Sequence, residues 1–125
     1  WDLWLRVSRN HQFLKLRWAT TLYRQHSNQG NKKVRTLDYR TILLIKSVNK
    51  WGLTSPNGKK LSTWEFYYQL SKYHAAYGLH HLQSEHGKKL LAYKSLFRAW
   101  TTFPFNFKPL LYILASKVTG WKPSW

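Results

Sequence analysis

Apolar side chains recur along most of this 125-residue chain at spacings of three and four residues, and no long stretch alternates apolar with polar positions. Such spacing indicates amphipathic helices, whereas alternation would indicate strands. Leu outnumbers Ile and Val together by 19 to 7, which also favours helices because β-branched residues prefer strands. The sequence therefore predicts an all-α fold of about five short helices, at Asn10–Gln25, Leu37–Lys50, Thr63–Tyr77, Lys88–Thr101 and Pro109–Val118.

The N-terminal part of the chain is predicted to combine an arm with the first of these helices. Residues 1–9 have no clear period, so we expect an extended basic arm, followed by a single small helical domain over residues 10–125. Asn10 is a favourable helix cap. A stripe at i, i+4 and i+8 follows it, formed by Leu14, Trp18 and Leu22. We expect Trp18 to face the core and the polar residues 27–33 to form a loop.

Capping residues delimit the other helices. Thr36 is the expected cap of the second helix, and Asp38 in its first turn suits the helix dipole. Ser62 and Glu65 form a capping-box pattern ahead of the third helix, and Pro109 suits the first position of the last one. Three of the helices are expected to end at glycines, namely Gly52, Gly78 and Gly120.

Charge is the strongest single property of the sequence. Lys and Arg number 21 against 4 acidic residues, for a net charge of +17. The excess is spread along the chain, with +7 over residues 1–35, +4 over 36–60 and +6 over 61–125. A small protein with this charge repels itself, and a surrounding polyanion removes the repulsion. Nucleic acid is the densest common polyanion, and anionic lipid is the second candidate.

Several kinds of chemistry are poorly supported by the composition. Cys is absent, which excludes disulfides, thiolate metal sites and Cys nucleophiles. The four acids are too scattered for a two-carboxylate or two-metal site, and the six His do not converge in the sequence, so we expect no enzyme activity, no metal and no cofactor. The longest stretches without charged residues, 73–84 and 99–107, are too short to span a bilayer. Because Met is also absent, we expect that Trp1 is not the translation start.

A Gly-Lys-Lys-Leu motif occurs twice, each time near a predicted helix start. Lys59 and Lys60 precede the third helix, and Lys88 and Lys89 open the fourth. Paired lysines are unfavourable beside the positive end of a helix dipole, but a phosphate placed there reverses the sign. The motifs therefore predict two phosphate clamps. The alternative is a pair of solvated basic turns, which a Lys-rich chain forms readily.

Arginines alternate with aromatic residues over the first 24 positions, a pattern that suits contacts to RNA phosphates and stacking on unpaired bases. We expect Arg6, Arg9 and Arg17 to contact phosphate. Lys32, Lys33 and Arg35 fall in or after the polar loop and are further backbone contacts. A solvated charge run is the alternative for these three residues.

One segment resembles a known family. The run Leu82–Lys89 contains Gly-Lys-Lys, with Ala92 five residues after the Gly, Phe97 ten after it, and Lys122-Pro123 some 35 residues on. This pattern resembles the N-terminal half of the small-subunit ribosomal protein seven family, which is mostly helical and binds small-subunit rRNA. The resemblance implies rRNA contact at Lys88 and Lys89. In composition the whole chain is similar to divergent organellar ribosomal proteins, which are also basic, poor in acids and rich in Trp, Tyr and Leu.

These observations predict a structural constituent of a mitochondrial ribosome, located in the matrix, with rRNA and neighbouring ribosomal proteins as partners and no small-molecule substrate. Its lysines and arginines would bind the rRNA backbone, and without RNA we expect the chain to aggregate or stay loose. One alternative is a basic accessory subunit of a membrane complex that contacts lipid headgroups. Another is a DNA-binding helical module.

Overall fold

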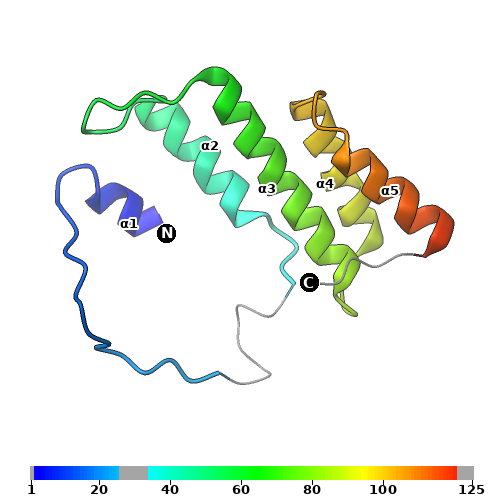
Figure 1. Cartoon of the computed structure of the whole chain (residues 1–125), viewed down its shortest axis with the longest axis horizontal. Coiled ribbons are helices and arrows are strands. Elements are labelled where there is room, and N and C mark those ends of the chain that lie inside the picture. The colour runs from blue at the N-terminus through cyan, green and yellow to red at the C-terminus, as the bar shows by residue number, and fades with distance from the viewer. Residues whose placement is uncertain (1, 26–33, 121–125) are drawn as a thin grey trace.

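The chain is all-α, as the periodicity predicts (Figure 1). A computed structural model describes residues 2–25 and 34–120. Those residues form five helices, and their only strand-like feature is an isolated bridge between Thr54 and Lys60. The helices are α1 (Asp2–Val7), α2 (Tyr39–Trp51), α3 (Thr63–Gln83), α4 (Lys89–Thr102) and α5 (Lys108–Thr119).

The core lies between α3, α4 and α5. Leu79 and Leu82 of α3 pack against Ala92 and Leu96 of α4, and the last two are fully buried. Tyr112 and Ile113 of α5 pack against the same cluster. The helices α2, α3, α4 and α5 follow one another across the molecule, so the α3–α4 pair separates α2 from α5 (Figure 1).

Helix α3 runs six residues beyond its predicted end, and the expectation that Gly78 terminates it is wrong. Gly78 is buried inside the helix, where an added Cβ would lie 2.7 Å from Leu96 Cγ and 2.9 Å from the Ala92 carbonyl oxygen. The glycine therefore serves the close approach of α3 and α4 and not a turn. The Ser62–Glu65 capping box at the start of α3 is confirmed.

The predicted start of α2 is also corrected. Asp38, and not Thr36, caps the helix, and one of its carboxylate oxygens accepts the Thr41 backbone N–H at 3.2 Å. The Thr41 hydroxyl donates to the other oxygen at 2.6 Å. Asp ranks above Thr as an N-cap residue, and its negative charge also meets the helix dipole. Gly52 ends α2 with a positive φ of 67°, as expected.

The two expectations for the N-terminal part of the chain are wrong. Residues 2–7 form α1, with Asp2 and Arg6 paired at 3.3 Å across one turn, and not an extended arm. Residues 10–25 contain no helix. Their apolar stripe remains exposed, at 86% for Leu14, 69% for Trp18 and 98% for Leu22, so Trp18 is not a core residue. An amphipathic helix is stabilised mainly by packing of its apolar face, and this stripe has no packing partner among the described residues.

Candidate nucleic-acid interface

The end of α2 brings together basic residues from two parts of the chain. Arg9 Nη1 donates a hydrogen bond to the Thr54 carbonyl oxygen at 3.1 Å, just beyond the end of α2. The Arg9 guanidinium carbon lies 5.5 Å from the centroid of the Trp51 ring, and Lys50 Nζ lies 5.2 Å from it. Cations are attracted to the face of an indole ring. Trp51 therefore attracts one cation from each of two parts of the chain.

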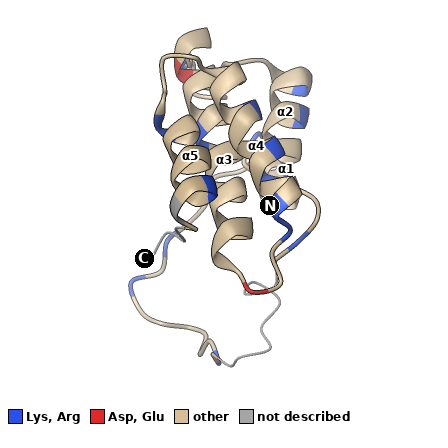
Figure 2. Ribbon diagram, turned by 90° about the vertical axis from the view of Figure 1, so that its right-hand side faces the viewer, with Lys and Arg blue, Asp and Glu red and all other residues tan. Residues whose placement is uncertain are grey.

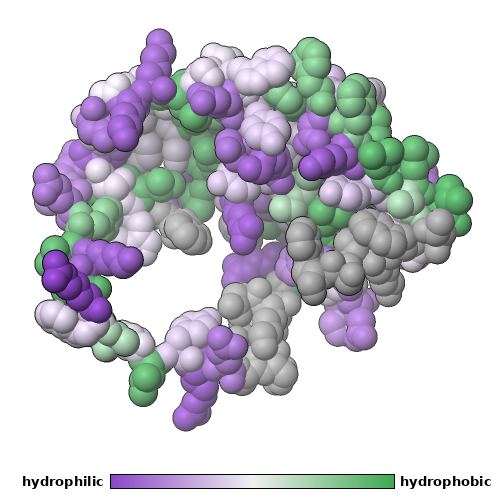
Figure 3. Space-filling view, in the orientation of Figure 1, coloured by the Kyte–Doolittle hydropathy of each residue, from purple (hydrophilic) through white to green (hydrophobic). Residues whose placement is uncertain are grey.

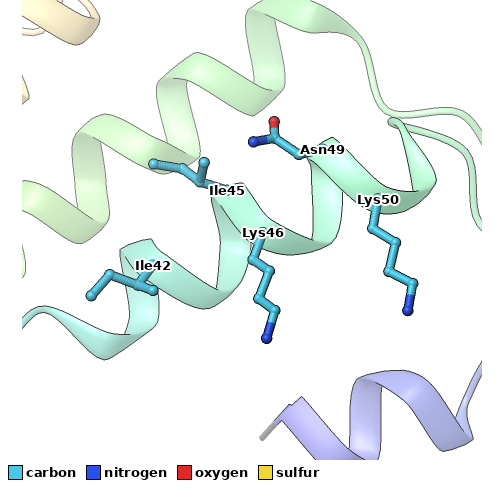
Figure 4. Close-up of a pocket in the computed structure, with 5 residues that line it drawn as sticks. All are labelled: Ile42, Ile45, Lys46, Asn49 and Lys50. Carbon is cyan, nitrogen blue, oxygen red and sulfur yellow. The ribbon is translucent and has the colours of Figure 1, made fainter.

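Two further cations complete this group, which we call the basic junction: Arg6, Arg9, Lys46 and Lys50. The Asp2 carboxylate lies 3.3 Å from Arg6 Nε and 3.9 Å from Lys46 Nζ, and thereby links α1 to α2. Both lysines point from α2 toward α1 across an open groove of about 650 Å³, which Ile42, Ile45 and Asn49 also line (Figure 4). Asp2 is the one carboxylate paired with the junction among the described residues.

A second, more polar groove adjoins the junction. Residues 8–12 line one side of it and residues 55–57 the other, around a volume of about 480 Å³. Arg9 belongs to both the junction and this groove. The hydroxyls of Ser8 and Ser55 and most backbone N–H groups of the groove already donate within the chain. The side-chain amides of Asn10 and Gln12 offer donors beside Arg9, which suits a phosphate–sugar backbone.

Lys59 and Lys60 lie on the loop that Arg9 reaches, and both side chains are exposed. The Lys59 carbonyl oxygen accepts bonds from the Ser55 N–H at 2.8 Å and from its hydroxyl at 2.9 Å, while Lys60 pairs with Thr54. The capping box already occupies the Ser62 and Glu65 N–H groups, and its hydrogen bonds lower the pKa of Glu65. Lys59 and Lys60 therefore do not share an anion site with these two N–H groups. Phosphate contact at the two lysines stays a prediction.

A buried histidine joins the backbone of Arg35 to that of Lys88. His81 is 2% exposed and lies between two backbone groups that fix its tautomer. The Lys88 N–H can only donate, so Nδ1 accepts it at 3.1 Å, and the Arg35 carbonyl oxygen can only accept, so Nε2 donates to it at 3.1 Å. Tyr77 supports the same stretch of chain, since its hydroxyl donates to the Thr36 carbonyl oxygen at 2.7 Å.

The neutral form of His81 is required by this geometry. An imidazolium carries a proton on both ring nitrogens, so it could not accept the Lys88 N–H. Burial lowers the pKa of His81, and the nearby His80 and Lys88 lower it further, against the bond to Arg35. The neutral His81 side chain therefore joins the backbone before α2, at Arg35, to the backbone before α4, at Lys88.

Gly87 explains one of the two Gly-Lys-Lys motifs in structural terms. A Cβ at this position would overlap the His81 carbonyl oxygen, so only glycine fits between His81 and Lys88. Gly58 has a positive φ of 80°, which other residues rarely adopt. Both glycines are therefore turn residues, and the anion-binding role predicted for the motifs concerns their lysines alone.

The remaining predicted contacts fall elsewhere. Arg17 is exposed on the extended segment, apart from the helices (Figure 1). Lys32 and Lys33 lie outside the described residues. Sequence reasoning missed Lys46 and Lys50. Their spacing of four residues on one helix, directly before Trp51, is the signal that could have found them.

A second buried histidine contributes to the fold. His74 is 5% exposed, and its Nδ1 lies 3.7 Å from the Asp38 carboxylate. Burial lowers the pKa of His74, Asp38 raises it and Arg98 lowers it, with burial the largest cause. Residues 2–25 and 34–120 hold no group of three potential metal ligands. Within those ranges no helix is both long and apolar enough for a bilayer.

The surface distribution of charge is consistent with a broad basic interface. Lys and Arg are placed along α1 and α2 and on the other helices as well, while Asp and Glu are scarce (Figure 2). Comparison of the chain with protein-family models, with curated proteins and with solved structures finds no match. The resemblance to the small-subunit ribosomal protein seven family thus stays a prediction from residues 82–123.

Proposed function

We propose that this chain is a non-catalytic, RNA-binding subunit of a mitochondrial ribosome, placed in the matrix among rRNA and neighbouring ribosomal proteins. The observation that carries the proposal is the basic junction. Arg9 and Lys50, from two parts of the chain, lie against Trp51, and Arg6 and Lys46 share the Asp2 carboxylate. Converging like charges repel one another, and phosphates between them would turn that repulsion into attraction.

The arrangement supports a backbone contact more than a base-specific one. Lysine and arginine side chains that bind phosphates fix the position of a protein on a nucleic acid without reading its sequence. Arg35, Lys88 and Lys89 would add a second contact, held in place by His81. Two of the described acids stabilise helix starts instead, since Asp38 caps α2 and Glu65 completes the capping box of α3.

A salt titration of binding to a structured rRNA fragment tests the proposal. The Arg9→Gln, Lys50→Gln double variant should bind more weakly. The plot of log K against log salt should also become shallower, by about 0.7–0.9 in slope for each phosphate that the variant no longer neutralises. Lys72→Gln, Lys94→Gln is the matched control, because it removes the same charge from α3 and α4. An equal weakening in both variants would contradict the junction as the contact surface.

Two further ligands separate the proposal from its alternatives. Under the same salt conditions, duplex DNA and vesicles of phosphatidylserine and phosphatidylcholine should bind more weakly than the RNA fragment. Stronger binding to vesicles would replace the proposal with the membrane-complex subunit, and stronger binding to duplex DNA would replace it with a DNA-binding module. In mitochondrial extracts the chain should sediment with ribosomal subunits and leave them only at high salt.

A further inference from the structure

Helix α5 presents an apolar stripe on the side that faces away from the core. Four side chains form this α5 stripe, with exposed fractions of 62% for Phe107, 60% for Leu111, 58% for Leu114 and 81% for Val118. The opposite side of the helix is already in use, because Pro109 is buried and Tyr112 and Ile113 pack on the core. Apolar surface gathers on this side of the molecule (Figure 3).

A helix that is apolar on both sides is typical of a buried helix. In α5 the apolar side chains surround most of the axis, and the residues 108–119 include no acid. Exposed apolar residues scattered singly need no explanation, but four in register on one helix indicate a contact surface. The α5 stripe is therefore expected to be covered in the assembled state.

The spacing of the stripe points to the kind of cover. Its residues are separated by four, three and four positions, which corresponds to heptad positions d, a, d and a. In that register Lys108 occupies an e position and Lys117 a g position, the two sites that flank a helix–helix seam. Both lysines are exposed, and Lys117 Nζ lies 5.5 Å from the Tyr93 ring centroid on α4.

We propose that the α5 stripe binds an amphipathic helix of a different protein, one with acidic residues beside its apolar seam. A second copy of this chain is disfavoured because its own lysines at e and g would meet Lys108 and Lys117, and because both copies carry +17. The narrow d-a-d-a seam fits a helix better than a lipid surface, which takes a wider apolar face. This surface is independent of the RNA contact.

Synthetic helical peptides of three heptads provide the probe. Both peptides carry Ile at a and Leu at d, and one has Glu and the other Lys at e and g. At a salt concentration that gives a cooperative melt, the intact chain should bind the Glu peptide more tightly. The Leu111→Ser, Leu114→Ser variant should weaken that binding at least about tenfold, because two apolar side chains no longer fill the seam. Circular dichroism should show unchanged helicity, since both side chains are exposed.

Charge reversal separates a specific seam from general attraction to a basic protein. Lys108→Glu, Lys117→Glu should invert the preference toward the Lys peptide, whereas Lys72→Glu, Lys94→Glu, with the same change of net charge, should leave the Glu peptide preferred. The same effect from both pairs would overturn the proposal. Two results with the Leu111→Ser, Leu114→Ser variant would also overturn the proposal. If the variant lost binding to phosphatidylserine vesicles, lipid would be the occupant, and if it lost self-association in sedimentation, a second copy would be.

Discussion

The α3–α4 pair and the α1–α2 part of the molecule are held in different ways. Between α3 and α4, buried Leu, Ala and Gly residues allow close contact. Helix α1 has no buried residue, and α2 has one, Thr41. Polar contacts attach this part instead, through Asp38, Tyr77 and His81. The α3–α4 pair therefore provides most of the stability, whereas α1 and α2 carry the closely spaced cations and are attached mainly by polar contacts.

The largest expected effect concerns the state of the whole chain without RNA. At low salt we expect no cooperative thermal melt of the isolated chain, because self-repulsion is strong at +17 and the core is small. The rRNA fragment, or high salt, should restore a cooperative melt by neutralising or screening the charge. Calorimetry at two salt concentrations measures this, and a sharp low-salt transition without RNA would show that the α3–α4 pair suffices.

The next effect contrasts one residue from each region, measured by urea unfolding at high salt. Leu96→Ala should lower the free energy of unfolding by about 2–5 kcal/mol, because it leaves a cavity at a fully buried site. Asp38→Ala should cost about 0.5–2 kcal/mol, the range for loss of an N-cap. Hydrogen exchange should show α2 opening in the second variant with α3 and α4 still protected. Equal global losses would mean that the regions unfold as one unit.

The smallest effect is a dependence on pH. The pKa values of His74 and His81 lie below that of a free imidazole, chiefly through burial, so folding favours their neutral forms. Their contribution is fully present above the unfolded pKa of about 6.5 and is lost as pH falls through the folded values. The protection factor of the Lys88 amide, which is the observed hydrogen exchange corrected for the slower intrinsic exchange in acid, should therefore fall on acidification. His81→Gln should remove part of this dependence, and an unchanged profile would exclude His81 as its source.

Local signals in the sequence predicted the helices well where they were strong. The Ser62–Glu65 box, Gly52 and Gly120 lie at helix ends as expected, because such caps depend on nearby residues alone. The end of α3 was predicted wrongly at Gly78, because this glycine is needed for a contact with α4, which is distant in the sequence. The helix over residues 10–25 was predicted wrongly for a different reason. Periodicity shows that a helix could bury one face, but it does not show that a surface exists to cover that face.

The candidate interface could be predicted only in part. The composition predicted a polyanion partner, and phosphate contact at Arg6 and Arg9 stays a prediction. Their grouping with Lys46 and Lys50 depends on the docking of α1 against α2, about 40 residues away, which no local pattern encodes. The link between Arg35 and Lys88 likewise depends on His81, whose role follows from burial.

The glycine inside α3 has a consequence for the dimensions of the molecule. With no side chain at position 78, α3 and α4 lie close together, with α2 packed on α3 and α5 packed on both helices. A larger residue there would push these two helices apart even with a smaller side chain at position 96, because its Cβ would still lie 2.9 Å from the Ala92 carbonyl oxygen. Related chains should therefore keep glycine at position 78 whatever residue occupies position 96.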